Sequence, residues 1–182
     1  AVKAEKETWN KELAGWDHEK DDWSLSVAKN SQYMHPRMML RELAKAMPDA
    51  PHEVVLVLGH DADRIDAISN DGNAPRIVHN PYYVQGLSTS IRCGVEAAGA
   101  CDAVLVCLGD MPLVPAGLAD RMAAGLNGAF AVQPVFAGKP GHPVLLSARA
   151  AVLAQTVSGD RGAGEILRQH AGEVAYIETE DE

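Results

Sequence analysis

The sequence predicts one α/β domain in three layers, with a mostly parallel sheet covered by helices on both faces. Three observations predict this fold. From about residue 36 onward, segments with helical periodicity alternate with short apolar segments, which is the order of βαβ units. Residues 103–108 form an apolar run without alternation, as expected of a strand buried on both faces. A chain of 182 residues with 47% hydrophobic residues is long enough for one domain with a substantial core.

The predicted elements follow one another along the chain. Residues 36–47 ("PRMMLRELAKAM") are amphipathic and begin with Pro36, a residue that suits the first helical turn. Residues 53–59 ("EVVLVLG") have the composition of a second buried strand. We expect further helices at 60–68, 88–100, 116–126, 142–150 and 164–170, and further strands at 76–80, 103–108, 129–136 and 173–178.

Residues 1–30 differ from the rest, so we divide the chain into an atypical N-terminal segment, residues 1–30, and an α/β domain, residues 31–182. All three tryptophans, Trp9, Trp16 and Trp23, lie in this segment seven residues apart, which places them on one stripe of a helix. We favour an amphipathic helix that packs on its own domain or on a second subunit over a nucleotide or membrane site. Residues 23–28 ("WSLSVA") could instead form a short strand.

Composition and charge exclude several classes of protein. The formal net charge of −9 argues against a nucleic-acid surface, and no apolar run approaches the ~20 residues that span a bilayer. The first 30 residues are too charged for a secretory signal, so we expect a cytoplasmic protein. Cys93, Cys101 and Cys107 show neither metal-binding nor CxxC spacing, and we interpret them as reduced structural residues.

The apolar run 103–108 ends abruptly at Gly109, and Asp110 follows. Its carboxylate is therefore expected at the carboxyl end of a buried strand, where open α/β sheets place their ligand crevice. A solvated turn aspartate is an equal alternative, because Asp is common in turns.

A second cluster precedes the helix expected at 88–100. Here Gly86, Ser88 and Ser90 can present backbone N–H groups and hydroxyls to an anion or to the edge of a base. The alternative is that Ser88 or Ser90 caps the helix, and both roles are compatible.

Two glycine-rich loops complete the set of candidates. In residues 138–146 ("GKPGHPVLL"), glycines and prolines hold His142 in irregular backbone, and such a histidine is more often structural than catalytic. In residues 158–167 ("SGDRGAGEIL"), Asp160 is either a second metal-binding carboxylate or the hydrogen-bond acceptor of its own turn.

Taken in order, these clusters resemble the nucleotidyltransferases of molybdenum-cofactor maturation, the molybdopterin cytidylyltransferase and guanylyltransferase group, and are most similar to the cytidylyl type. The resemblance covers residues 36–182. The residues that carry it are "VVLVLGHDA" (54–62), "NPYYVQGLSTSIRCGV" (80–95), "VLVCLGDMPLV" (104–114), "GKPGHPVLL" (138–146) and "SGDRGAGEIL" (158–167).

The resemblance implies a Rossmann-like fold and the transfer of a nucleoside monophosphate, CMP rather than GMP, from CTP or GTP to a molybdopterin-type acceptor. Pyrophosphate is released with Mg²⁺ as cofactor, and a molybdoenzyme or its chaperone is an implied partner. The resemblance implies that Asp110 is a metal ligand and that the loop with Gly86, Ser88 and Ser90 lies beside the nucleotide. To these we add our own assignments: Asp160 as a second metal ligand, His142 as a catalytic residue beside Asp110 and on the acceptor side, and Lys139 and Arg161 as phosphate contacts.

One part of the family pattern has no counterpart in the sequence. Family members open with a strand that runs into a Leu-Ala-Ala-Gly-x-Ser-x-Arg-Met-Gly loop and a lysine, which hold the triphosphate. Residues 11–20 ("KELAGWDHEK") share only Leu-Ala-Gly with that loop, and Lys29 is the basic candidate that remains for a phosphate. The alternative function is therefore a non-catalytic relative, an accessory or cofactor-binding protein in molybdoenzyme maturation. A sugar-1-phosphate nucleotidyltransferase, which also needs the loop, is a third.

Overall fold

The computed structural model of the protein describes most of the chain from residue 53 onward, namely residues 53–60, 62, 75–109, 111, 114–115, 117–159 and 162–180. The helix expected at 36–47, the tryptophan-bearing segment and the domain boundary after residue 30 lie outside the described residues, as does most of the helix expected at 60–68. None of the described helices combines the length and the apolar character that crossing a bilayer requires.

Among the described residues, the first sheet consists of two parallel strands, β1 (Val55–Leu58) and β2 (Arg76–His79). They are paired over their whole length, and the backbone N–H of Asn80 extends the ladder by donating to Leu58 O at 2.7 Å. Both strands were predicted from their apolar residues. Their pairing fixes Asn80 at the carboxyl end of the two strands.

The second sheet has five described strands: β3 (Ala103–Val106), β4 (Ala131–Phe136), β5 (Lys139–Pro140), β6 (Val144–Ser147) and β7 (Val174–Glu178). Their hydrogen-bonded order is β3-β6-β4-β5, and β7 pairs with β4. Among the described residues, β1 pairs only with β2, and β3 pairs only with β6.

The α/β fold class is confirmed, although the described pairing is mixed where we expected a mostly parallel sheet. β6 runs antiparallel to both β3 and β4, and β5 runs antiparallel to β4, whereas β7 is parallel to β4. The physical reason is the length of the connection between β4 and β6. It is too short to hold a crossover helix, so the chain turns back beside the strand it has just left.

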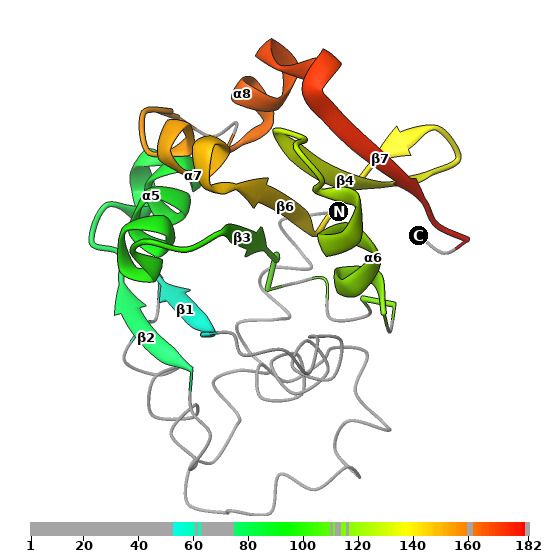
Figure 1. Ribbon diagram of the computed structural model, residues 1–182. Helices are drawn as coiled ribbons and strands as arrows, with labels where there is room; N and C mark the ends of the chain where they lie inside the picture. The colour runs from blue at the N-terminus through cyan, green and yellow to red at the C-terminus, as the bar shows by residue number, and fades with distance from the viewer. Residues whose placement is uncertain are drawn as a thin grey trace, which may run out of the picture. The chain divides into compact units, whose positions relative to one another are not determined.

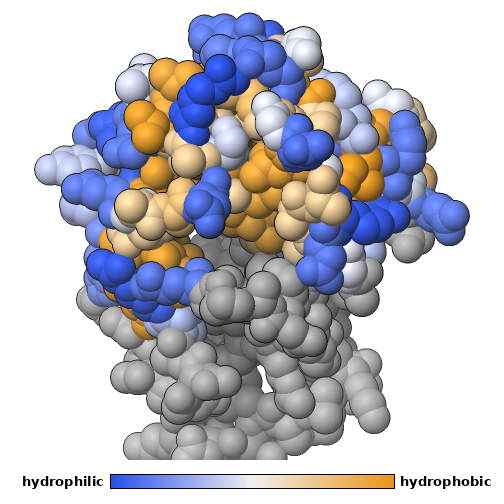
Figure 2. Space-filling view, viewed as in Figure 1, coloured by the Kyte–Doolittle hydropathy of each residue, from blue (hydrophilic) through white to orange (hydrophobic). Residues whose placement is uncertain are grey.

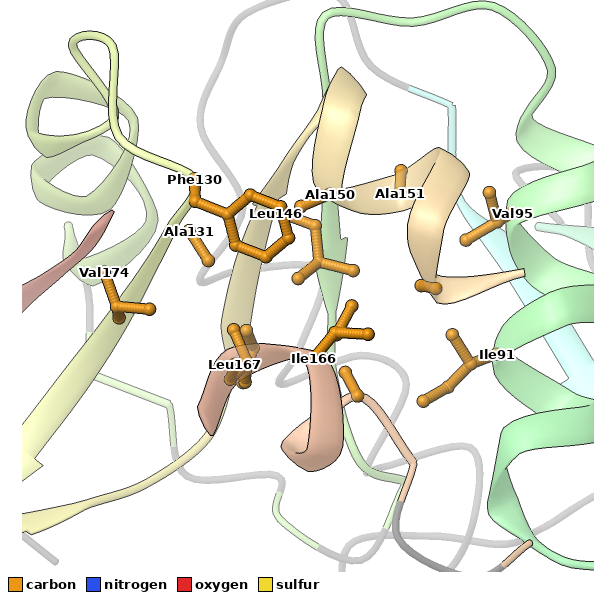
Figure 3. Packing of buried hydrophobic residues seen from close by; sticks show 13 residues of the cluster. Ile91, Val95, Phe130, Ala131, Leu146, Ala150, Ala151, Ile166, Leu167 and Val174 are labelled. Carbon is orange, nitrogen blue, oxygen red and sulfur yellow. The ribbon is translucent and has the colours of Figure 1, made fainter. Parts of the chain in front are cut away.

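Four α-helices of the described part of the chain flank the strands (Figure 1): α5 (Leu87–Ala98), α6 (Leu118–Gly125), α7 (Ala148–Ala154) and α8 (Gly164–Gln169). Successive side chains of the second sheet point to opposite faces. In β6, Val144 and Leu146 pack into a cluster with α5, α7 and α8 (Figure 3), whereas Leu145 packs against α6. The alternation produces the expected three layers, with helices on both faces of the sheet.

One segment predicted as a helix is largely a strand. We expected residues 142–150 to be helical, but Val144–Ser147 form β6, and α7 begins only at Ala148. Because β6 lies between β3 and β4 and is covered on both faces, its side chains at 144–146 are all buried. A short continuous apolar run fits a buried strand as well as a buried helix, which is why periodicity did not distinguish them.

The surface viewed in Figure 2 shows hydrophobic residues in patches between hydrophilic ones. Large apolar side chains that are exposed include Tyr82, Val84, Val152 and Tyr176. The first two belong to the segment that follows β2, which is described with the functional site below.

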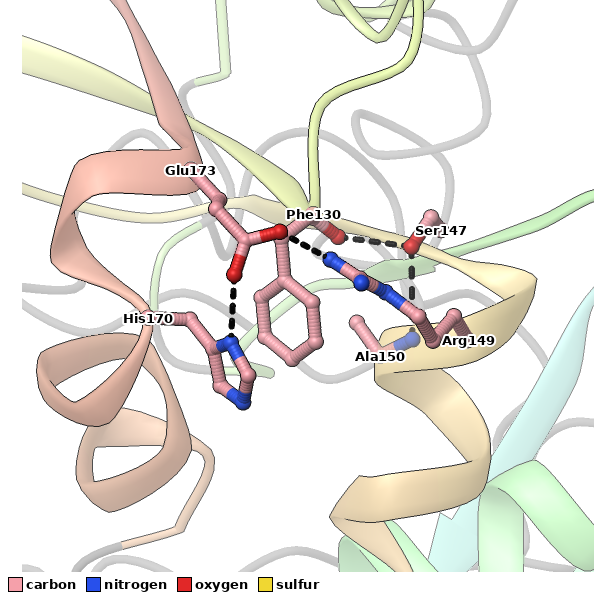
Figure 4. A network of polar contacts seen from close by, with 6 residues as sticks. All are labelled: Phe130, Ser147, Arg149, Ala150, His170 and Glu173. Carbon is pink, nitrogen blue, oxygen red and sulfur yellow. Dashed lines mark hydrogen bonds and ion pairs between the residues drawn. The ribbon is translucent and has the colours of Figure 1, made fainter.

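A polar network joins α7 to the C-terminal part of the chain around the fully buried ring of Phe130 (Figure 4). Glu173 is 2.8 Å from Nδ1 of His170 and forms an ion pair with Arg149. The His170 ring stacks on Phe130 with centroids 4.1 Å apart, and the Arg149 guanidinium lies 5.0 Å from the Phe130 centroid. The hydrogen bonds from His170 and from Arg149 lower the pKa of the Glu173 carboxyl.

This network makes the stability of the protein depend on pH in a defined direction. A carboxyl whose pKa is lower in the folded chain stabilises the fold above its ordinary pKa and loses that contribution as the pH falls through its folded pKa. We therefore expect Glu173→Gln to lower Tm near pH 7, and the difference from the wild type to shrink below about pH 4. Thermal unfolding over this range tests the prediction, with the exposed Glu180→Gln as the matched control. A difference in Tm that stays constant down to acid pH would contradict it.

Candidate functional site

The segment after β2 is held against the ends of both strands of the first sheet. It contains the short helix η1 (Tyr83–Gln85). Gly59, which follows β1, leaves room for this helix, because a Cβ at Gly59 would lie 2.6 Å from Cβ of Tyr83. The Tyr83 hydroxyl is 3.4 Å from Nδ1 of His60, and Oδ1 of Asn80 accepts the backbone N–H of Tyr82 at 2.9 Å. The segment that contains η1 therefore lies against the carboxyl ends of both β1 and β2.

Helix α5 begins without a side-chain cap. Its N-cap is Gly86, whose φ of 111° lies in the region that favours glycine. The capping alternative for Ser88 and Ser90 is therefore wrong. Instead, the backbone N–H of Ser88 donates to Gly159 O at 3.2 Å, so that a carbonyl from a distant loop satisfies a free N–H of the first turn. The Ser88 side chain is 1% exposed, and its hydroxyl has no hydrogen-bond partner among the described residues.

Gly159 and Gly162, which flank Asp160 and Arg161 in the sequence, both lie against the start of α5. A Cβ at Gly162 would lie 3.0 Å from Cδ2 of Leu87 and 3.2 Å from Cδ1 of Ile91, and Gly162 has a φ of +54°. Asp160 and Arg161 lie outside the described residues, but the glycines on either side of them contact α5. Two of the predicted clusters, far apart in the sequence, therefore come together here.

The register of β3 and β6 relates His142 to the turn that contains Asp110. Val106, the last residue of β3, pairs with Val144, the first residue of β6. The residues before β6 and the residues after β3 therefore lie at the same end of this strand pair. His142, two residues before β6, is partly buried. The backbone N–H of Met111 donates to Leu108 O at 3.2 Å across the turn, while Asp110 itself lies outside the described residues.

Two basic candidates have different outcomes. Lys139 is exposed in the two-residue strand β5, and Lys29 lies outside the described residues. Their phosphate contacts remain predictions, as do the roles of His142 and of the serines.

The sequence analysis missed Asn80, a residue that organises the site. Its side chain is 3% exposed, and Nδ2 donates to Oγ1 of Thr89 at 2.9 Å and to Oγ of Ser90 at 3.0 Å. The available signal was a polar residue at the end of a predicted strand, directly before a proline. Only the fold shows that its amide reaches the first turn of α5.

A cavity of about 410 Å³ lies on another face of α5, and its lining includes Pro81, Tyr82, Gln85, Arg92, Cys93 and Glu96. Burial raises the pKa of the Cys93 thiol, and the charge of Glu96 adds to that effect. Cys107 directly follows β3, and burial raises the pKa of its thiol to about 11. Both thiols are therefore protonated at neutral pH, and all three cysteines are free, as expected.

The donors expected for a metal ion are the carboxylates of Asp110 and Asp160. In the part of the chain that the structure describes, no group of three His, Cys, Asp or Glu side chains is placed to hold a metal ion. Both expected aspartates lie outside the described residues, and in the sequence each follows an exposed glycine, Gly109 or Gly159. Carboxylate oxygens are the ligands that Mg²⁺ prefers, so the chemistry of this donor pair fits a divalent cation.

Comparison with known proteins identifies the family. The family model of the MobA-like NTP transferase domain matches residues 26–174, which is most of the chain. The chain belongs to this family. The resemblance found in the sequence is thereby confirmed at the level of the family.

The sequences of known proteins that are similar to this chain align with different fractions of its length. Nicotine blue oxidoreductase of Paenarthrobacter nicotinovorans is 34% identical over 140 residues, covering 72% of this chain and 68% of that protein. Molybdenum cofactor cytidylyltransferase of Escherichia coli (strain K12) is 34% identical over 95 residues, covering 52% and 48%. Sulfoacetaldehyde acetyltransferase of Alcaligenes xylosoxydans xylosoxydans is 36% identical over 78 residues, which is 38% of this chain and only 12% of that relative.

Solved structures agree on the fold. The crystal structure of Rv0371c from Mycobacterium tuberculosis H37Rv in complex with manganese has a TM-score of 0.63 to this chain at 20% sequence identity, covering 82% of this chain and 78% of that one. At this identity the likeness shows that the two proteins share the α/β fold.

The packing of the 158–162 loop on α5 leads to a prediction about stability. We expect Gly162→Ala to lower the free energy of unfolding by about 1–3 kcal/mol, because an L-residue is strained at this φ and its Cβ would press on Leu87 and Ile91. Gly172→Ala is the matched control, since a Cβ there would meet nothing within 4 Å. Urea unfolding of both variants measures the difference. Equal stability of the two variants would show that the loop does not need glycine at this position.

Proposed function

We propose that this chain transfers a nucleoside monophosphate from a nucleoside triphosphate to a molybdopterin-type acceptor and releases pyrophosphate. Membership of the MobA-like NTP transferase family supports the transfer of a nucleotidyl group. The observation that carries the proposal is the contact of the 158–162 loop with the start of α5. It joins the chain on either side of Asp160 to the helix that bears Gly86, Ser88 and Ser90.

The nucleotide is CTP rather than GTP in this proposal, and the acceptor is a molybdopterin-type compound that carries a terminal phosphate. The support is the match to a molybdenum cofactor cytidylyltransferase, which covers about half of each chain. A molybdoenzyme or its chaperone would then receive the product. We further propose that this takes place in the cytoplasm without nucleic acid or a membrane as partner, in keeping with the net charge of −9.

The chemistry asks the protein mainly to position two phosphates and to neutralise charge. An oxygen of the acceptor phosphate attacks the α-phosphorus in line, and the bond from that phosphorus to the pyrophosphate breaks. Asp110 and Asp160 would hold Mg²⁺, which supplies positive charge that offsets the charge on the leaving group. Gly86 and Ser90 contact the nucleotide at the start of α5, and His142 lies on the acceptor side. No side chain has to act as a nucleophile.

The direct test is pyrophosphate release from CTP or GTP with Mg²⁺ and a phosphorylated pterin acceptor. Release that requires both the acceptor and the metal ion supports the proposal. A protein that binds the acceptor but neither binds Mg²⁺ and CTP in calorimetry nor releases pyrophosphate would instead be the accessory protein that we considered from the sequence. Because one of the similar proteins bears the name of an oxidoreductase, the assay measures pyrophosphate itself.

Asp110 is the residue on which the proposed reaction depends most. We expect Asp110→Asn to reduce metal-dependent turnover by at least ~10²-fold, on the scale of losing one electrostatic group at the transition state, and to leave the fold intact. Asp120→Asn, an exposed change in the first turn of α6, is the control and should keep wild-type turnover. Full activity in Asp110→Asn would remove this residue from the mechanism.

A further inference from the structure

Helix α5 has three distinct faces, and the proposed nucleotide contact lies on the third. Ser88, Ile91 and Val95 are buried on the first face, which belongs to the core. The second face lines the 410 Å³ cavity through Thr89, Arg92, Cys93 and Glu96. Ser90 and Gly94 lie four residues apart and so share the remaining face.

The third face is turned toward β1. A Cβ at Gly94 would lie 3.1 Å from Cγ2 of Val57, which places this face against the side chains of β1. Ser90 is one turn nearer to the start of the helix, and its partner Asn80 is level with Leu58, to whose carbonyl it donates its backbone N–H. The Ser90 hydroxyl, on a half-buried side chain, is therefore at the carboxyl end of the strands, where α/β sheets bind ligands.

The orientation of the Asn80 amide is determined by a backbone group. Its Oδ1 accepts the N–H of Tyr82, which can only donate, so Nδ2 must face the two hydroxyls. Thr89 passes its own hydrogen to backbone carbonyls, to Gly86 O at 2.9 Å or Tyr82 O at 3.1 Å. Each hydroxyl thus accepts one N–H of Asn80.

This pattern leaves the Ser90 hydrogen available. A serine hydroxyl has one hydrogen to donate, and in the described residues the oxygen of Ser90 has Asn80 as its partner, in a bond that Ser90 accepts. The hydroxyl can therefore act as a donor to a bound ligand. A donor can bind the carbonyl oxygen of cytosine, whereas adenine has no carbonyl oxygen and offers only ring nitrogens, at other positions, as acceptors.

We propose that Asn80 is a specificity-determining positioning residue, which holds the Ser90 hydroxyl as a hydrogen-bond donor that reads a carbonyl oxygen of the nucleobase. The inference rests on the proposed function, since it assumes that Ser90 contacts the base. It goes further because it assigns the direction of that hydrogen bond and the residue that sets it. Bases with a carbonyl, such as cytosine, are selected over adenine.

The assignment is tested by replacing the amide N–H groups of residue 80, which donate to Ser90 and Thr89, by a carboxylate oxygen, which accepts. In Asn80→Asp the carboxylate still accepts the N–H of Tyr82 but also accepts the Ser90 hydrogen, which turns the hydroxyl away from the base. The readout is the ratio of the Kd values of ATP and CTP, each with Mg²⁺, from calorimetry. Any repulsion between the new charge and the triphosphate is common to both nucleotides, so the ratio isolates the base.

We expect the wild type to bind CTP more tightly than ATP, and this ratio to fall by about 5- to 10-fold in Asn80→Asp and in Ser90→Ala, the scale of one hydrogen bond. The double variant should match Ser90→Ala, because Asn80 acts through Ser90. Asn127→Asp, in an exposed turn, is the control and should keep the wild-type ratio. Thermal unfolding verifies that each variant is folded, and Ser90→Ala tests the donor even where Asn80→Asp does not fold.

The outcomes separate this inference from the proposed function. Nucleotide binding without a preference for CTP over ATP, or a preference that survives in folded Ser90→Ala or Asn80→Asp, overturns the inference alone. A wild-type protein that binds no nucleoside triphosphate at all contradicts the proposed function, and the inference falls with it.

Discussion

The candidate site depends on one backbone hydrogen bond, from the N–H of Ser88 to the carbonyl of Gly159. The first turn of α5 lacks a side-chain cap, so an acceptor from elsewhere in the chain has to satisfy its free N–H groups. The loop that supplies this acceptor approaches closely enough that Gly162 touches Leu87 and Ile91. The same hydrogen bond therefore holds the loop in place and satisfies a free N–H group at the start of α5. The chain on either side of Asp160 is placed by the helix that carries the serines.

The sheet supplies the rigid support for this arrangement. Its side chains alternate between two apolar clusters, one under α5, α7 and α8 and the other under α6. Because α5 contributes Ile91 and Val95 to the first cluster, the core determines the orientation of this helix. Asn80 then connects the helix to the end of β2. Both polar atoms of this buried amide have hydrogen-bond partners, which favours a single geometry for the loop between them.

Much of this architecture could be predicted from the sequence. Apolar runs located β1, β2, β3, β4 and β7, and helical periodicity located α5 and α6, because each signal is local. The antiparallel course of β6 could not be predicted, because its three consecutive apolar residues show no period and its direction depends on the preceding turn. For the site, the residue pattern identified the clusters around Gly86 and Asp160. Their contact could not be predicted, because it joins segments far apart in the sequence and depends on the tertiary structure. Asn80 was missed because its three hydrogen-bond partners lie in a turn and a helix that come later in the sequence.

The position of β7 has a consequence for how the protein is made. β7 is the last described strand, yet it forms the longest ladder of β4, pairing from Ala131–Val174 to Val135–Glu178. Its carbonyl and N–H groups complete the edge of β4 that is opposite to β6. During synthesis, β4 leaves the ribosome more than forty residues before its partner. The sheet can be finished only after residues 174–178 have emerged, and until then β4 presents an unpaired apolar edge that is open to wrong partners.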